Sequence, residues 1–136
     1  FNDVGCAVPK LLITMKRRSG LSREEFIEYY NERHLTNVSR ILPATGAGRR
    51  VHIRNFVDPE HPLVALIGDG RAAPGEPLFD CVTEIIFEND ALAAEFFRSF
   101  FAPEAIAQIR DDEAQFIDLD SIRFYMVDTI EVVRGE

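Results

Sequence analysis

The order of its secondary-structure signals is the feature that most constrains how this chain of 136 residues can fold. Apolar segments with a period of two are typical of strands, and segments with apolar residues every three or four positions are typical of helices. The strand-like segments are 10–17, 49–57, 79–88 and 121–133, and the helix-like segments are 22–40, 91–101 and 103–116. This β-α-β-β-α-β order, with one additional helix before the last strand, predicts an α+β fold. The expected form is a ferredoxin-like βαββαβ antiparallel sheet with helices on one face.

Local signals mark where the three helices begin. Ser22 and Glu25 form the S-x-x-E pattern of a capping box, which predicts the start of the first helix. Asn89 is expected to cap the second helix, and Pro103 suits the first turn of the third. The helix boundaries are therefore predicted by capping chemistry as well as by periodicity.

The length of the chain predicts one domain covering 1–136. Residues 58–78 are rich in Pro and Gly and interrupt the pattern as a loop insertion, with a short strand or helical turn expected at 63–68. A loop of this length in a small domain is typically functional or mobile.

Composition and charge restrict the partners. The net charge is −8, and an acidic surface repels phosphate backbones and anionic lipid, so we expect neither nucleic acid nor membrane as a partner. No apolar run is long enough to span a bilayer, and no secretory signal is visible. Cys6 and Cys81 stand in no motif and are expected to be free, buried thiols in a reducing cytosol. We therefore expect a cytoplasmic protein.

The first and last strands carry apolar residues on both faces, as in a sheet that is buried on both sides. Helices cover one face only, so the other face needs a cover, and a second copy of the chain is the economical one. We expect a homodimer in which two sheets face each other as a dimeric α+β barrel. The alternative is a monomer with a polar second face, which the charged strand residues keep open: Arg50, His52, Arg54 and Arg123.

A histidine interrupts the apolar stripe of the first helix. Phe26, Tyr30, His34, Val38 and Ile41 recur at intervals of three or four, so His34 is expected to face the sheet. It is either a buried histidine paired with a carbonyl or an acid, or an acid/base opening into a pocket. Spacing alone leaves both interpretations open.

Other residues are candidates for the same site. Tyr30 and Tyr125 are candidate catalytic donors beside His34, although core packing is the simpler role for each. The candidate substrate-binding residues are Phe26, His52, Arg54, Asp80 and Phe116. His52 and Arg54 suit a carboxylate, but we slightly favour ion pairs at the dimer interface for them.

For two acidic residues near the end of the third helix, exposure to solvent is the simplest interpretation. Asp112 and Glu113 are expected to be solvated, although Asp112 is also placed to orient a histidine.

Motifs for cofactor chemistry are absent. The sequence has no GxGxxG, Walker loop, HExxH, CxxC or G-x-S-x-G pattern, and three scattered histidines do not make a metal site. We expect no metal and no cofactor. Haem is a distant alternative, for which His34 is the one candidate axial ligand.

Three segments resemble one known family. KLLITMKRRSGLSREEFIEYYNERH is similar to the opening of the EthD domain, with its R-x-G-L-S-x-E-E-F pattern and an aromatic-rich helix ending in histidine. LFDCVTEIIFEN resembles the family's third strand, and IRDDEAQFIDLDSIRFYMVDTIEV resembles its D-E-x-x-F segment and last strand. The chain departs from many members after His34, where LTNV replaces the family's x-P-L.

The resemblance implies a dimeric α+β barrel with a pocket between helices and sheet. Its relatives include cofactor-free polyketide cyclases, lactone isomerases, decarboxylases and dehydratases, in several of which the histidine matching His34 is an acid/base. We therefore expect a cofactor-independent lyase or cyclase acting on a small hydrophobic, aromatic or polyketide intermediate of secondary metabolism. The alternative is a non-catalytic ligand-binding or accessory protein of an oxidative pathway, since the name-giving members were tied to ether degradation.

Overall fold

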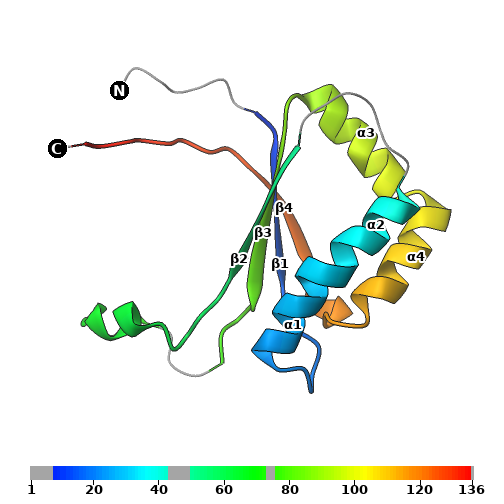
Figure 1. Ribbon diagram of the computed structural model, residues 1–136. Helices are drawn as coiled ribbons and strands as arrows, with labels where there is room; N and C mark the ends of the chain where they lie inside the picture. Colours follow the sequence, from blue (N-terminus) through cyan, green and yellow to red (C-terminus); the bar gives the residue numbers. More distant parts are fainter. Residues whose placement is uncertain (1–7, 43–49, 73–75, 136) are drawn as a thin grey trace.

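The computed structural model describes residues 8–42, 50–72 and 76–135. Four strands form one antiparallel sheet in the order β2-β3-β1-β4. The strands are β1 (Lys10–Met15), β2 (Arg50–Phe56), β3 (Cys81–Phe87) and β4 (Arg123–Val127). The main helices lie on one face of this sheet, as Figure 1 shows. The predicted α+β, ferredoxin-like antiparallel arrangement is confirmed.

The first helical region is continuous but changes its winding. It consists of α1 (Arg23–Tyr29), the π-helical turn η1 (Tyr30–His34) and α2 (Leu35–Ile41). The later helices are α3 (Asp90–Phe100) and α4 (Pro103–Glu113), with short 3-10 helices η2 (Pro62–Leu66) and η3 (Leu119–Ser121). Periodicity predicted the helix but not its π turn, a feature that is frequent at functional sites.

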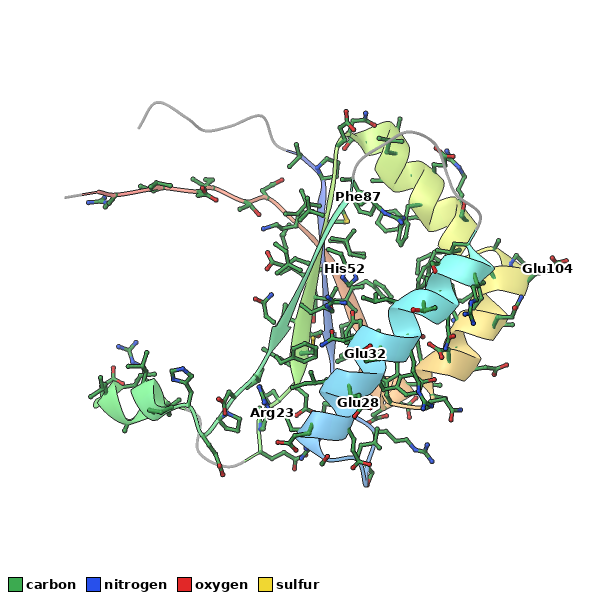
Figure 2. The ribbon with its side chains drawn as sticks, viewed as in Figure 1. Arg23, Glu28, Glu32, His52, Phe87 and Glu104 are labelled. Carbon is green, nitrogen blue, oxygen red and sulfur yellow. The ribbon has the colours of Figure 1, made fainter. Side chains whose placement is uncertain are left out.

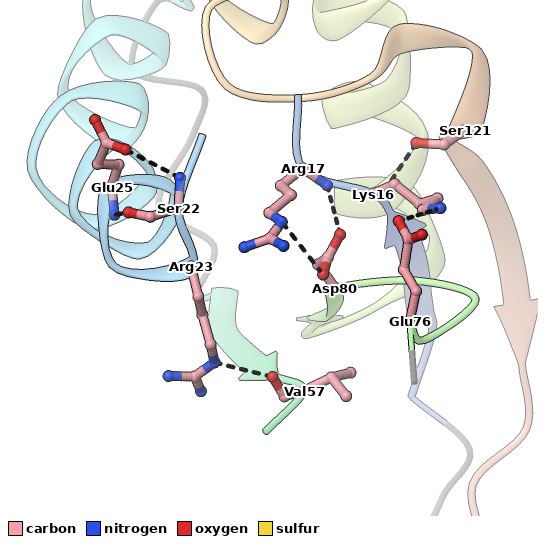
Figure 3. A network of polar contacts seen from close by, with 9 residues as sticks. All are labelled: Lys16, Arg17, Ser22, Arg23, Glu25, Val57, Glu76, Asp80 and Ser121. Carbon is pink, nitrogen blue, oxygen red and sulfur yellow. Dashed lines mark hydrogen bonds and ion pairs between the residues drawn. The ribbon is translucent and has the colours of Figure 1, made fainter. Parts of the chain in front are cut away.

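The predicted caps are present. The Ser22 hydroxyl accepts from the backbone N–H of Glu25 at 3.1 Å, and the Glu25 carboxylate accepts from the Ser22 N–H at 3.0 Å (Figure 3). Asn89 caps α3 by accepting from the N–H of Leu92, and Pro103 opens α4. Within the 58–78 insertion, the helical turn is η2, and residues 73–75 lie outside the described part.

The last strand is shorter than the predicted 121–133. It ends at Val127, because Val127 pairs with Lys10 and β1 begins there. Residues 128–135 continue as an extended arm with no strand partner in the described chain, and Figure 1 shows this arm leaving the sheet. The alternation that predicted a strand is therefore present, but no strand among the described residues pairs with it.

The strand register fixes which residues face the helices. Leu11, Ile13 and Met15 of β1 pair with residues of β3 and β4 that point to the same side. Two buried clusters result. One gathers Leu11, Ile85, Phe87, Ala93, Phe96, Phe100 and Ile109, and the other gathers Met15, Phe26, Tyr30, Cys81, Phe116 and Ile117.

The open face of the sheet is largely apolar, with one ion pair. Val51, Ile53 and Tyr125 are exposed there, and Lys10 pairs with Glu84 at 2.9 Å. No helix in the described ranges is long and apolar enough to cross a membrane. Cys81 is a free, buried thiol, as expected, and Cys6 lies outside the described residues, as does the predicted loop 44–48.

Candidate functional site

A cavity of about 570 Å³ lies between the helices and the sheet. Both buried clusters contribute to its wall, and most of its lining is aliphatic or aromatic. The residues that line it are Ile13, Met15, Tyr30, His34, Leu35, Val38, Ser39, Leu42, Arg50, His52, Ile85, Leu92, Phe96, Ser99, Phe100, Glu113, Ile122 and Phe124. A concave, apolar space with a few polar groups is typical of sites for small organic ligands.

His34 reaches this cavity from the π turn η1 and is only 9% exposed. Its Nδ1 lies 2.5 Å from Oδ2 of Asp112, which belongs to α4. A neutral imidazole that donates Nδ1–H to a carboxylate keeps Nε2 as an acceptor. The pairing therefore leaves Nε2 as the nitrogen available to a ligand.

Asp112 is held as an anion by three donors. Besides His34, the Tyr29 hydroxyl and the Asn37 amide each donate to Oδ1 at 2.7 Å. Burial opposes the charge, but these hydrogen bonds outweigh it and lower the pKa of Asp112. The expectation that Asp112 is a solvated helix charge is wrong, and its alternative, that it orients a histidine, is confirmed.

Burial raises the pKa of a carboxyl group but lowers the pKa of an imidazole. Desolvation lowers the pKa of His34, and the hydrogen bond and charge of Asp112 only partly oppose that effect. The ring is therefore neutral at neutral pH, which is the form that can accept a proton.

Tyr30 and Phe116 support the imidazole. Their ring centroids lie 5.4 Å and 4.9 Å from that of His34. The Tyr30 hydroxyl shares a hydrogen bond of 2.6 Å with the Thr83 hydroxyl, and burial raises the pKa of Tyr30. Phe116 is fully buried and Phe26 is 1% exposed, and neither lines the cavity. Both residues are therefore placed as packing behind the site.

Two predicted residues lie away from the cavity. Tyr125 pairs with Leu12 and is half exposed on the open face of the sheet, opposite to the helices. Asp80 precedes β3, where its carboxylate accepts from the backbone N–H of Arg17 at 2.8 Å (Figure 3). Neither residue lies on the cavity wall that His34 shares.

The inward residues of β2 bring positive charge to the cavity side. Arg50 and His52 line the cavity, and Figure 2 shows His52 between the sheet and the helices. Arg50 lies over the Phe96 ring at 4.7 Å and Arg54 over the Tyr30 ring at 5.7 Å. These residues lie on the face of β2 that turns toward the helices, and ion pairs at a dimer interface stay a prediction for them.

Two of these β2 side chains have unusual environments. The Nη1 atom of Arg54 is buried and has no hydrogen-bond partner among the residues described. The edge position leaves much of His52 exposed, but its ring faces the cavity. Desolvation there, and then the charges of Arg54, His34 and Arg50, lower the pKa of His52 to about 4.

Glu113 is the site residue that the sequence analysis missed. It lines the cavity and is only 9% exposed, rather than solvated as expected. The missed signal was periodicity, because Ile106, Ile109, Glu113 and Phe116 recur at intervals of three or four. The argument applied to His34 in the first helix therefore applies equally to Glu113 in α4.

The described residues contain no group of three or more His, Cys, Asp or Glu that could hold a metal ion. The arrangement of groups in the cavity is chemically able to support proton transfer. It combines a neutral imidazole oriented by a carboxylate, a second buried carboxyl group, and the cationic side chain of Arg50.

Comparisons with known proteins agree with this fold. Residues 18–120 match the family model described as the EthD domain. A crystal structure of an ethyl tert-butyl ether D (EthD) family protein from Bacillus halodurans C-125 is similar with a TM-score of 0.50 and 15% identity. That match covers 90% of this chain and 99% of the other.

Two other structures are more distant. A dimeric protein of unknown function with a ferredoxin-like fold, from Bacteroides fragilis, has a TM-score of 0.41 and 16% identity, covering 91% of this chain and 96% of the other. A DABB family protein with a ferredoxin-like fold, from Mesorhizobium loti, has a TM-score of 0.41 and 14% identity, covering 94% and 100%. A search of curated proteins found no match.

Proposed function

Because the chain belongs to the EthD domain family and carries, in a cavity wall, His34 hydrogen-bonded to Asp112, we propose that it is a cofactor-independent lyase or cyclase. Its substrate is an aromatic or polyketide intermediate of secondary metabolism, of the type found in fungal polyketide pathways. The observation that carries this proposal is the hydrogen bond that fixes Nδ1 of His34 and leaves Nε2 to the cavity.

Proton transfer from carbon is the step that this arrangement suits. Nε2 of His34 removes a proton from a carbon next to a carbonyl group, and Asp112 stabilises the imidazolium that forms. Arg50, on the cavity wall, balances the negative charge of the enolate or of a substrate carboxylate. Decarboxylation, dehydration and ring closure all proceed through such an anion, which the substrate itself delocalises.

The remaining candidates take supporting roles in this proposal. Tyr30 orients the imidazole, and His52 and Arg54 contribute to the electrostatics of the substrate site. Tyr125 lies on the opposite face of the sheet, so no proton transfer within one subunit is assigned to it. Asp80 is assigned to holding the backbone at Arg17.

A ligand-binding or accessory role is the competing hypothesis. An apolar cavity suits a carrier equally well, but a carrier of apolar ligands gains nothing from burying ionisable groups, which costs free energy. The buried His34, Asp112 and Glu113 therefore favour catalysis over storage.

The deciding experiment compares His34→Ala with His61→Gln, a change at an exposed histidine of the loop. Each protein is assayed against aromatic β-keto acids and β-hydroxy ketones, and its affinity for 2-naphthol, a flat two-ring phenol, is measured separately. We expect His34→Ala to lose turnover by about 10²- to 10⁴-fold while it still binds 2-naphthol. Undiminished turnover removes His34 from the mechanism, binding without any conversion by the unmodified protein supports the accessory role, and a Soret band in the purified protein supports haem.

We also propose that the protein is a cytoplasmic homodimer. The support for the dimer is the open sheet face, where Val51 and Ile53 are each 38% exposed and Tyr125 is 51% exposed. A second sheet would remove this apolar surface from water and complete a dimeric α+β barrel. The support for the location is the buried free thiol of Cys81, since such thiols are typical of reducing compartments.

A further inference from the structure

Glu113 is a buried ionisable group that the mechanism above does not use. It is the last residue of α4, it lines the same cavity as His34, and it is only 9% exposed. Within the described chain, no hydrogen bond or ion pair to its carboxyl group is found, whereas the neighbouring Asp112 has three donors. The carboxyl oxygens are not fully buried, unlike the Nη1 atom of Arg54, so they reach the space of the cavity and can meet a ligand there.

The surroundings of Glu113 favour its protonated form. Burial raises the pKa of Glu113 to about 7, with Arg110 lowering it and Asp112 raising it further. The ionisable groups that share its surroundings are Arg110 and Asp112 on α4, Tyr30 and His34 on η1, and Arg50 and His52 on β2. Near neutral pH a substantial fraction of the protein therefore presents a carboxylic acid to the cavity, together with a neutral imidazole.

We propose that Glu113 is the proton donor of the site and delivers its proton to a substrate oxygen while His34 removes a proton from carbon. This inference rests on the proposed function and narrows it to dehydration. In a β-hydroxy ketone, Nε2 of His34 takes the proton from the carbon between the carbonyl and the carbinol. The electron pair of that C–H bond becomes the new C=C bond, the C–O bond breaks, and the hydroxyl leaves as water with the proton from Glu113.

The step balances without an oxidant, a reductant or a metal. His34 ends protonated and Glu113 ends ionised, and one proton passes from the imidazolium to the carboxylate through water to reset the site. Decarboxylation requires a proton only at the carbon that loses carbon dioxide, so it gives Glu113 no separate task. Two groups poised in opposite protonation states are the arrangement that dehydration requires.

The first test reads the carboxyl group directly in the free protein. Infrared difference spectra of the unmodified protein, Glu113→Gln and Asp111→Asn are recorded across the pH range, with Asp111→Asn as the control for an exposed acid on the same helix. We expect a protonated-carboxyl band that disappears as the pH rises through about 7, is absent in Glu113→Gln and is retained in Asp111→Asn. The absence of this band from the unmodified protein, or its survival in Glu113→Gln, overturns the proposal.

The second test uses 2-methoxynaphthalene as the probe, because its ether oxygen accepts a hydrogen bond and cannot donate one. A protonated Glu113 donates a hydrogen bond to this oxygen, so affinity is expected to fall as the pH rises through about 7. Glu113→Gln keeps a donor that does not titrate, and its affinity is expected to be constant over the same range. Binding whose pH dependence is the same in both proteins overturns the proposal.

Kinetics separate this inference from the proposed function. With a β-hydroxy ketone that the protein converts, Glu113→Gln is expected to lose about 10²-fold in kcat and to lose the alkaline decline of the pH profile. Unchanged kcat in this variant overturns the donor role and leaves His34 catalysis standing. Failure of the unmodified protein to convert any substrate instead overturns the catalytic assignment, while the infrared and 2-methoxynaphthalene results still decide whether Glu113 donates.

Discussion

Nδ1 of His34 and Oδ2 of Asp112 lie 2.5 Å apart, although the two residues are separated by 78 positions in the sequence. The contact joins the π turn η1 to the last turn of α4 across the cavity wall. Asp112 is kept charged by three donors, whereas the adjacent Glu113 has none among the described residues and burial raises its pKa to about 7. Two neighbouring acids of one helix thus receive opposite protonation states from their surroundings.

Asp112→Asn is predicted to impair proton transfer by the His34 imidazole while the imidazole itself stays in the cavity. An amide at this position neither stabilises the imidazolium nor selects the tautomer with Nδ1–H, so turnover is expected to fall by about 10²- to 10⁴-fold. The pKa of His34 is expected to fall further, because the carboxylate currently opposes the effect of burial. Proton NMR of the histidine ring and steady-state kinetics measure both effects, and Asp111→Asn is the matched control. A His34 pKa that does not move contradicts this account of the pair.

Tyr30→Phe is predicted to destabilise the protein through Thr83. The two hydroxyls share a buried hydrogen bond of 2.6 Å, so removing that of Tyr30 leaves Thr83 with only the weaker contact to Cys81 Sγ at 3.7 Å. Such a loss costs about 1–3 kcal/mol in the free energy of unfolding. The double variant Tyr30→Phe with Thr83→Val is expected to recover part of this loss, because no polar group is then left unpaired. Urea denaturation of the three variants measures the difference, and strictly additive losses would argue against the hydrogen bond as the cause.

Sequence periodicity predicted the fold and much of the first helix's contribution to the site. The stripe of Phe26, Tyr30 and His34 is buried as expected, because an amphipathic helix that packs on a sheet turns its apolar face toward the sheet. The inward position of Glu113 is contained in the periodicity of α4, but the roles of Asp112 and Glu113 were harder to predict. Their roles depend on which groups from α1, η1 and α2 meet them, and one element's pattern does not contain that information. Residues 128–133 alternate as a strand does, but they have no strand partner among the described residues, and pairing depends on a second segment as well.

The stability of the protein is predicted to respond to pH through Glu113. Its pKa in the folded state is raised from 4.5 to about 7, so the folded state binds this proton more tightly than the unfolded state does. The resulting stabilisation is present below the unfolded pKa and is lost as the pH rises to about 7, a difference of about 3 kcal/mol. His34 contributes with the opposite sign, because burial lowers its pKa in the folded state. As the pH falls below the pKa of this histidine in the unfolded chain, the unfolded state binds the proton more tightly and the folded state loses stability.

The comparison that isolates Glu113 is the free energy of unfolding of Glu113→Gln minus that of the unmodified protein, at several pH values. His34 titrates in both proteins, so its contribution cancels. This difference is expected to increase between mildly acidic and neutral pH, since the glutamine has no charge to bury. A difference that stays constant with pH would show that Glu113 ionises as freely in the folded protein as in the unfolded chain.

Ile53→Asp is predicted to weaken the proposed homodimer. Ile53 lies on the open face of the sheet opposite Glu84, where it is 38% exposed in the single subunit. A carboxylate at this position would be desolvated beside a second acid if another sheet covered it, which opposes association. Leu66→Asp is the control, because Leu66 is 78% exposed on the η2 turn of the insertion loop rather than on the sheet. Sedimentation velocity is expected to show a dimer for the unmodified protein and Leu66→Asp, and a monomer for Ile53→Asp. A dimer that is unaffected by Ile53→Asp would place the contact between subunits on another surface.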